Sequence, residues 1–327
     1  MEKLTDSHGR KLTYLRISIT DRCNFRCRYC MPPEGIEWIP HDRIMSFEDI
    51  EFLVSALLPM GISKVRFTGG EPFVRRGFVS FLKDIRELHS ELEVTVTTNG
   101  TMLKPYTEDL QSSGVSGINI SLDTLDRDKF RFVTRSDGYD DVINGISTLA
   151  EKTSIPLKIN TVLIRKFNDM EVESLIRFAR KNRAVIRFIE FMPLDEEVWT
   201  KESFISSDEI FENMPGGPEQ WMALAQASNN ASGGPAKYYK NRETGQKIGI
   251  IAAVTNHFCN SCNRLRVTAT GQLRACLFAK EGVELLPALR RRDEQGLQKL
   301  IREAAFLKPE SWTILENSER HMSQIGG

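Results

Sequence analysis

The chain has no excess of charge of either sign. Its 327 residues include 44 Lys and Arg and 44 Asp and Glu, so the formal net charge at pH 7 is zero. A chain without a net positive charge is not attracted as a whole to nucleic acid or to an anionic membrane surface, and we expect neither as a partner. Any anionic ligand must therefore be met by cations that the fold gathers in one place.

The sequence also has no long hydrophobic run. A membrane span needs roughly 18 apolar residues, and the longest candidate, from Leu53 to Met60, is about half as long and contains Pro59. The first residues carry charges and lack the apolar core of a signal peptide. We expect a cytoplasmic protein, and in the cytoplasm clustered cysteines are more often metal ligands than disulfides.

No cysteine lies outside two groups of three. These are Cys23, Cys27 and Cys30, the first triad, and Cys259, Cys262 and Cys276, the second triad. A cubane iron–sulfur cluster normally takes four thiolates, so three leave one iron open to another ligand. Zinc prefers paired Cys-x2-Cys knuckles, so the x3 spacing of the first triad argues against zinc. For the second triad, His257 keeps a zinc site open as an alternative.

Strand-like and helix-like segments alternate over the first two-thirds of the chain. The expected strands are 14–20, 64–68, 93–98, 117–122, 157–163 and 185–191, and the expected helices are 47–58, 78–89, 105–112, 139–152 and 170–181. Such alternation gives parallel βαβ units. Six units are fewer than the eight of a closed barrel, so we predict an α/β fold with a partial (β/α)6 TIM-like barrel.

The pattern changes after the last of these strands. The segment 215–235 is rich in Gly, Pro, Ala, Asn and Ser, which is typical of a linker or loop. We therefore divide the chain into a barrel, 1–214, a linker or loop, 215–236, and a smaller C-terminal Fe–S-binding region, 237–327.

Five distinctive motifs lie at the ends of the expected strands. They are the first triad, Gly69-Gly70-Glu71-Pro72, Thr97-Thr98-Asn99-Gly100, Ser121-Leu122-Asp123 and Met192-Pro193. A Gly-Gly pair alone would indicate only a turn between a strand and a helix. In barrel enzymes, however, the chemistry collects at the carboxyl ends of the strands, and these five motifs are all expected there.

Cations occupy unusual places in the sequence. Arg264 and Arg266 are two residues apart, so on a strand they share one face beside the second triad. Arg16, Arg66 and Lys158 lie in three expected barrel strands, where a charged residue is costly unless it is paired. Each alone is more often a salt-bridge partner or a solvated residue. Together they favour a polyphosphate substrate, because guanidiniums bind phosphate well.

The first triad and the Gly-Gly-Glu-Pro turn together resemble the radical S-adenosylmethionine (SAM) superfamily. Segments 20–32, 65–72 and 258–266, with Cys276 and the terminal Gly-Gly, are similar to its GTP 3′,8-cyclase family, from about Arg16 to the last residue. That family opens molybdenum cofactor biosynthesis. The resemblance implies a lyase-class enzyme that converts GTP to (8S)-3′,8-cyclo-7,8-dihydroguanosine 5′-triphosphate. A 5′-deoxyadenosyl radical would take the ribose 3′ hydrogen, and the carbon radical would add to C8 of guanine.

The resemblance also implies a role for each matching residue. Two [4Fe–4S] clusters are implied, one on the first triad that binds SAM and an auxiliary one on the second triad that meets the guanine ring. The implied SAM-binding residues are Tyr29, Gly70, Ser121 and Met192. The implied GTP-binding residues are Arg16, Arg66, Thr97, Lys158, Arg264, Leu265 and Arg266. Gly326 and Gly327 would be catalytic, although such a tail is by itself also typical of a frayed terminus.

The implied partners are an electron donor such as flavodoxin or ferredoxin, a second copy of the chain in a homodimer, and the next pathway enzyme, which takes the product. Two other hypotheses fit part of the pattern. One is a peptide-maturing radical SAM enzyme, whose auxiliary region usually carries more cysteines than three. The other is a non-catalytic iron–sulfur or zinc protein that acts as a scaffold or sensor, for which the Gly-Gly-Glu-Pro turn has no use.

Overall fold

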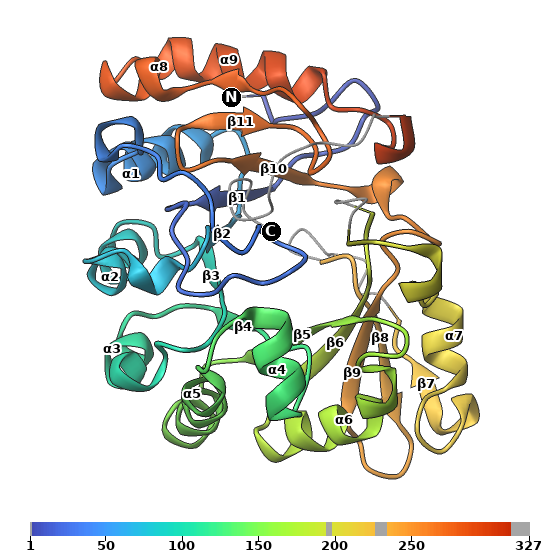
Figure 1. The fold of residues 1–327 in the computed structure, drawn as a ribbon. Helices are drawn as coiled ribbons and strands as arrows, with labels where there is room; N and C mark the ends of the chain where they lie inside the picture. The colour runs from blue at the N-terminus through green and yellow to red at the C-terminus, as the bar shows by residue number, and fades with distance from the viewer. Residues whose placement is uncertain (1, 194–197, 226–233, 315–327) are drawn as a thin grey trace.

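The computed structural model describes residues 2–193, 198–225 and 234–314. Figure 1 shows an arc of strands with helices along its outer side. The six barrel strands are parallel and adjacent in sequence order. They are β1 (Tyr14–Ser18), β2 (Lys64–Thr68), β3 (Glu93–Thr98), β4 (Gly117–Ser121), β5 (Leu157–Leu163) and β6 (Val185–Glu190). The predicted partial barrel is confirmed.

Helices connect these strands. They are α1 (Phe47–Leu57), α2 (Phe78–Leu88), α3 (Thr107–Ser112), α4 (Arg127–Thr134), α5 (Tyr139–Lys152) and α6 (Val172–Lys181). The start of α1 illustrates how the sequence sets a helix end. Ser46 accepts a hydrogen bond from the Asp49 backbone, and the Asp49 carboxylate accepts one from the Ser46 backbone. This capping box satisfies donors that the first turn would otherwise leave unpaired.

The C-terminal strands extend both edges of the same sheet. They are β7 (Trp221–Ala223), β8 (Lys237–Asn241), β9 (Lys247–Ile251), β10 (Arg264–Val267), β11 (Gln272–Arg274) and β12 (Val283–Glu284). Strand β9 pairs in parallel with β6, and β10 pairs in parallel with β1. The division into barrel, linker and C-terminal region stays a prediction, and in the described residues the strands of all three parts, β7 of the expected linker included, join one sheet.

The remaining helices are α7 (Ser207–Glu212), α8 (Leu286–Arg290) and α9 (Glu294–Phe306). Both α8 and α9 contact α1, which places the last described helices on the outer side of the barrel beside its first helix (Figure 1). Trp221, at the start of β7, is 5% exposed and belongs to the main core.

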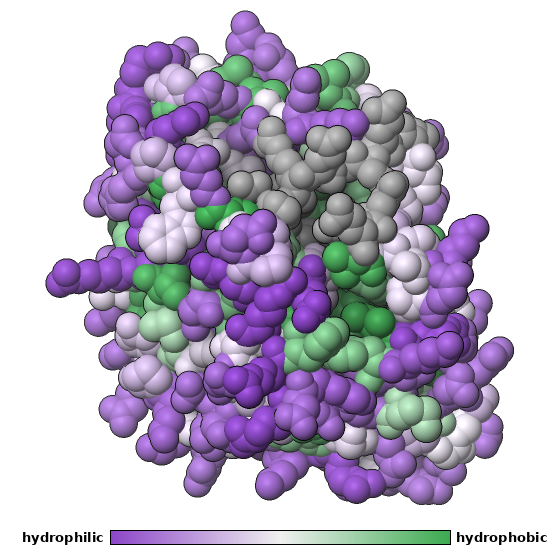
Figure 2. Space-filling view, viewed as in Figure 1, coloured by the Kyte–Doolittle hydropathy of each residue, from purple (hydrophilic) through white to green (hydrophobic). Residues whose placement is uncertain are grey.

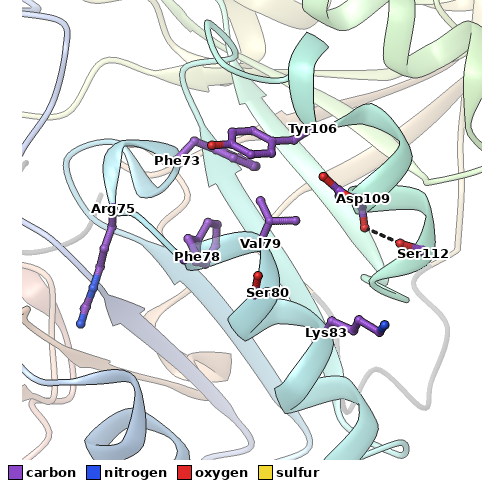
Figure 3. A pocket seen from close by; sticks show the side chains of 10 residues that line it. Phe73, Arg75, Phe78, Val79, Ser80, Lys83, Tyr106, Asp109 and Ser112 are labelled. Atoms are coloured by element: carbon purple, nitrogen blue, oxygen red, sulfur yellow. Dashed lines mark hydrogen bonds between the residues drawn. The ribbon is translucent and has the colours of Figure 1, made fainter.

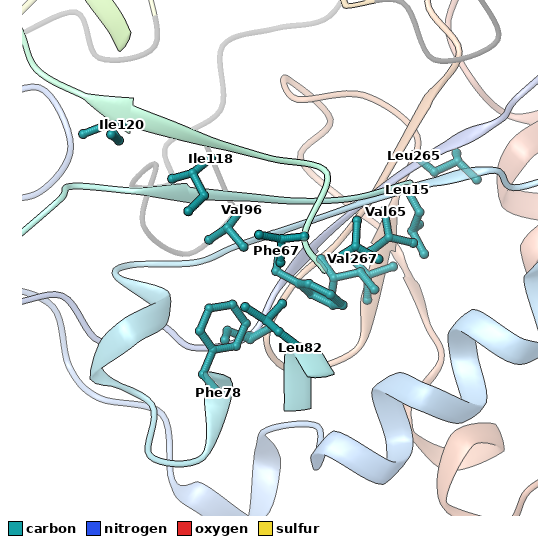
Figure 4. Close-up of a cluster of buried hydrophobic side chains, with 14 of the residues drawn as sticks. Leu15, Val65, Phe67, Phe78, Leu82, Val96, Ile118, Ile120, Leu265 and Val267 are labelled. Carbon is teal, nitrogen blue, oxygen red and sulfur yellow. The ribbon is translucent and has the colours of Figure 1, made fainter. Parts of the chain in front are cut away.

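The hydrophobic core lies between the sheet and the helices. Leu15, Phe67 and Leu265 face it from neighbouring strands, and Phe78 and Leu82 of α2 pack onto them (Figure 4). Burying a side chain such as Phe67 stabilises the fold by about 1.5–3 kcal/mol. Successive side chains of a strand point to opposite faces of the sheet. The apolar residues face the helices, so the residues between them line the inside of the arc.

The surface is mostly polar. Hydrophilic residues predominate on the face seen in Figure 2. None of the helices in the described part of the chain has the length and apolar composition that crossing a bilayer requires.

Candidate active site

Backbone hydrogen bonds join the Gly-Gly turn to the segment that enters the first triad. Gly70 N donates to Thr20 O at 2.8 Å, and Glu71 N donates to Arg22 O at 2.8 Å. A Cβ atom on Gly70 would lie 2.8 Å from Asp21 O and closer still to Arg22 O. Only a residue without a side chain allows this approach. The turn after β2 therefore fixes the path of the chain into the first triad.

The carboxylate of Glu71 holds the loops after β2 and β3 together. It is fully buried and accepts hydrogen bonds from Phe73 N at 3.1 Å, Thr98 Oγ1 at 2.8 Å and Asn99 N at 2.7 Å. Burial raises the pKa of Glu71 to about 7, although these hydrogen bonds act in the opposite direction. Asn99 continues the network, because its amide lies 3.9 Å from Cys23 Sγ.

The first triad has the chemistry of a cluster site. Its three cysteines are half-buried. The pKa of Cys27 is raised well above its usual value by burial and then by the nearby Cys30 and Cys23. Three thiols that repel one another as thiolates, in a partly apolar pocket, fit a cationic iron core that would deprotonate them.

A network beside the first triad joins the ends of β4 and β6. Tyr29 donates a hydrogen bond to Asp123 Oδ2 at 2.5 Å, and its ring lies 6.3 Å from that of Phe191. Asp123 also accepts from Val162 N, and burial raises its pKa to about 6. Ser121 is exposed at the end of β4, and Met192 is half-buried after β6. Asp123 was not among the predicted site residues, although it follows Ser121 by two positions.

Three arginines lie in register across the inner face of the sheet. Arg16 in β1 is opposite Arg266 in β10 on one side and Arg66 in β2 on the other. The neighbouring row contains Arg264, Tyr14 and Lys64. Side chains at matched positions of adjacent parallel strands point the same way, so the pairing of β10 with β1 carries the arginines of the C-terminal region into the barrel.

The pKa values show how closely these cations are packed. Burial and then Arg266 lower the pKa of Arg16 well below its usual range. Burial lowers the pKa of Arg266 to about 10, with a further contribution from Arg264. Burial would raise the pKa of Tyr14, but four cations, Arg66 first, outweigh it and lower that pKa. The inner face therefore favours a ligand with several negative charges.

Polar side chains continue the inner face across β3 to β6. Thr97 Oγ1 is buried without a hydrogen-bond partner. In the neighbouring strands, Arg187 donates to Asn160 Oδ1 at 2.9 Å and to Asn119 Oδ1 at 2.5 Å. Lys158 is half-buried beside this network, and burial, followed by Arg187 and Lys64, lowers its pKa to about 8.

The predicted residue set omits Lys64, Arg187, Asn119 and Asn160. The signal that identified Arg66 was available for Arg187, because each is a cation inside an apolar strand pattern. The side chain of Leu265 is fully buried on the outer face, in the core with Leu15 (Figure 4), so a contact between Leu265 and GTP would have to involve its backbone. The predicted catalytic residues Gly326 and Gly327 lie outside the described residues.

The second triad is next to the arginine rows. Cys259 begins a short 3₁₀ turn (Cys259–Ser261), Cys262 precedes β10 by two residues, and Cys276 follows β11. Burial would raise the pKa of Cys262, but Arg264 and then Lys308 outweigh it and hold that pKa at about 6. The thiolate is thus favoured here, which fits a site for a cationic cluster core.

No three His, Cys, Asp or Glu side chains of the described ranges converge on a position for one metal ion.

A cleft of about 250 Å³ lies elsewhere, between α2 and α3 (Figure 3). The rings of Phe73 and Tyr106 stack across it at 5.8 Å. Arg75, at its edge, already donates to Ile19 O and Met45 O. No residue of either triad or of the arginine rows lines this cleft, so we do not assign it to the site.

Comparisons with known proteins agree with this geometry. Family models of the Radical SAM superfamily and of Molybdenum Cofactor Synthesis C match residues 17–179 and 184–314. The chain is 40% identical to the GTP 3′,8-cyclases of Thermodesulfovibrio yellowstonii and of Geobacter sulfurreducens, in each case over 99% of this chain and 100% of the relative.

Among solved structures, Streptococcus suis SuiB is similar in fold, with a TM-score of 0.63 and 17% identity over 86% of this chain and 67% of that one. The relatives that match over nearly the full length decide the assignment. The chain belongs to the GTP 3′,8-cyclase family of the radical SAM superfamily.

Proposed function

We propose that this chain converts GTP to (8S)-3′,8-cyclo-7,8-dihydroguanosine 5′-triphosphate, the first step of molybdenum cofactor biosynthesis. Membership of the family implies SAM and an iron–sulfur cluster. The finer proposal is two [4Fe–4S] clusters, one on each triad. The observation that carries the proposed activity is the in-register row of Arg266, Arg16 and Arg66, which joins the second triad to the inside of the barrel.

When bound, SAM and the cluster on the first triad would supply a 5′-deoxyadenosyl radical. The residues of this chain orient the reactants and exclude water. Tyr29, Gly70, Ser121 and Met192 lie at or just beyond the carboxyl ends of four strands, where they would line SAM. Glu71 and Asp123 hold those loops together through buried hydrogen bonds.

The cations of the inner face would bind the triphosphate. Arg16, Arg66, Lys158, Arg264 and Arg266 supply the charge. The hydroxyl of Thr97 is buried and unpaired, so a ligand atom can satisfy it. Crowded cations destabilise one another until an anion arrives, so triphosphate binding relieves a cost already present in the free protein.

The proposed partners come from the family resemblance. Reduction of a cluster requires a one-electron donor, for which we propose a flavodoxin or ferredoxin. We also propose a homodimer and the transfer of the product to the next enzyme of the pathway.

The direct test is to incubate reconstituted, dithionite-reduced protein with SAM under anaerobic conditions and to quantify 5′-deoxyadenosine. We expect formation that depends on GTP and that ATP does not support. Slow formation that is indifferent to GTP would leave the radical SAM chemistry and exclude GTP as the substrate. No formation, with iron and sulfide present on the first triad, would contradict the proposed activity.

We expect the affinity for GTP to fall by about tenfold between pH 7 and pH 9. The pKa of Lys158 is about 8 in the free protein, so this lysine is largely protonated at pH 7 and largely neutral at pH 9. The protonated form attracts the triphosphate, so the affinity falls as the pH rises. Calorimetric titration at several pH values measures the slope. Lys158→Arg keeps its charge over this range, and an equal decline in that variant would contradict the role of Lys158.

A further inference from the structure

A buried lysine outside the predicted site lies behind the second triad. Lys308 is 3% exposed and follows α9 by two residues. Its ammonium donates to Arg264 O at 2.9 Å and to Ala275 O at 2.5 Å. Arg264 is two residues after Cys262, and Ala275 immediately precedes Cys276. One side chain therefore ties together the two backbone segments that carry Cys262 and Cys276.

Arg10 binds the same region. Its guanidinium donates to Cys259 O at 2.8 Å, to Pro309 O at 2.7 Å and to Glu310 O at 3.0 Å. Its Nε forms a buried ion pair with Asp6 at 2.5 Å. Arg10 therefore also fixes the backbone of Cys259, the remaining cysteine of the second triad. It fixes the chain just after Lys308 as well.

The charge of Lys308 also needs an explanation. A buried ammonium loses its hydration, and two carbonyl dipoles replace it only in part. Burial lowers the pKa of Lys308, whereas Cys262 and Cys276 act to raise it. As thiolates, these two cysteines would supply the negative charge that favours the ammonium form of this lysine.

We propose that Lys308 is a positioning residue for the auxiliary cluster: it holds Cys262 and Cys276 at a fixed separation, and its charge stabilises the cluster in the reduced state. This inference rests on the proposed binding of a cluster by the second triad. Three thiolates give a cubane cluster a net negative charge, and reduction adds another. A fixed cation nearby therefore favours the reduced form and raises the reduction potential.

The test uses the full-length chain with Cys23→Ala, Cys27→Ala and Cys30→Ala, so that only the second triad can bind a cluster. After anaerobic reconstitution, iron and sulfide per chain, iron loss to a chelator, and the midpoint potential are measured. We expect Lys308→Met to lose iron at least about tenfold faster and to shift the midpoint potential downward. Lys308→Arg should recover most of the potential. Lys299→Met, an exposed lysine of α9, is the matched control.

The outcomes distinguish failure of the proposed role of Lys308 from failure of the proposed auxiliary cluster. If Lys308→Met keeps the iron and the potential of the control, Lys308 is not a positioning residue. If the parent chain with an intact second triad binds no cluster, the auxiliary cluster itself is excluded. Should Lys308→Met fail to fold, as circular dichroism of the apo-protein would reveal, Lys308→Gln retains donors for the carbonyls without the charge. The same downward shift of the potential is expected there, and its absence would overturn the proposal.

Discussion

Cys27→Ser is expected to abolish SAM cleavage, whereas Cys262→Ser is expected to abolish the cyclic product and leave SAM cleavage. Each triad has only three thiolates, so neither has a spare ligand, and a serine hydroxyl does not ionise as a thiol does. The two triads lie at opposite ends of the paired strands β1 and β10: the first follows the carboxyl end of β1, whereas Cys259 and Cys262 precede β10. Loss of one cluster site therefore need not disturb the other.

The measurement is 5′-deoxyadenosine and cyclic product from the same anaerobic reaction, with iron content determined for each variant. We expect 5′-deoxyadenosine at background for Cys27→Ser. For Cys262→Ser we expect 5′-deoxyadenosine without matching product. If both variants lost SAM cleavage while Cys262→Ser kept the iron of the first triad, the separate roles of the two triads would be wrong.

Gly70→Ala is expected to remove the ability of the first triad to hold a cluster. The new Cβ would collide with backbone atoms of Asp21 and Arg22, which cannot rotate away as a side chain can. Overpacking of this kind costs about 1–3 kcal/mol when the chain shifts to relieve it. The segment that must shift leads directly to Cys23, so the position of the first ligand changes.

The experiment uses a chain with Cys259→Ala, Cys262→Ala and Cys276→Ala, so that all bound iron belongs to the first triad. Iron per chain and the apo-protein melting temperature are compared with those of Gly234→Ala. A Cβ atom on Gly234 would meet no atom within 4 Å beyond its chain neighbours, so alanine should be tolerated there. Equal iron and an equal melting temperature in the two variants would show that the close approach of the two loops is not required.

The local pattern of the sequence predicts most of the barrel. The expected strands 64–68, 93–98 and 157–163 coincide with β2, β3 and β5, because alternation and β-branched residues mark buried strands in sequence. Helix α4 was not predicted. It is short, and Phe130, Val133 and Thr134 are its only buried residues, which is too few for a periodic signal.

No local sequence pattern indicates which distant segments of the chain pair with each other. Nothing near Arg264 indicates that β10 pairs with β1, because strand pairing across the chain depends on the whole fold. For the same reason Arg264 and Arg266 were predicted as a pair, and Arg16 and Arg66 were grouped with Lys158. The row that joins Arg266, Arg16 and Arg66 was not predicted. Lys308 was missed because its partner carbonyls are 33 and 44 residues away in sequence.

The pairing of β10 with β1 has a consequence for biosynthesis. Asn263 and Thr13, which flank this pair, are 250 residues apart. At roughly 5–20 residues per second, a ribosome needs about 10–50 s to make β10 after β1 has emerged. During that time the nascent barrel has an open strand edge, and open edges pair with other chains. A message cut short before the codon for Arg264 should therefore yield an aggregating fragment that is cleared by proteolysis, and not a barrel with partial function.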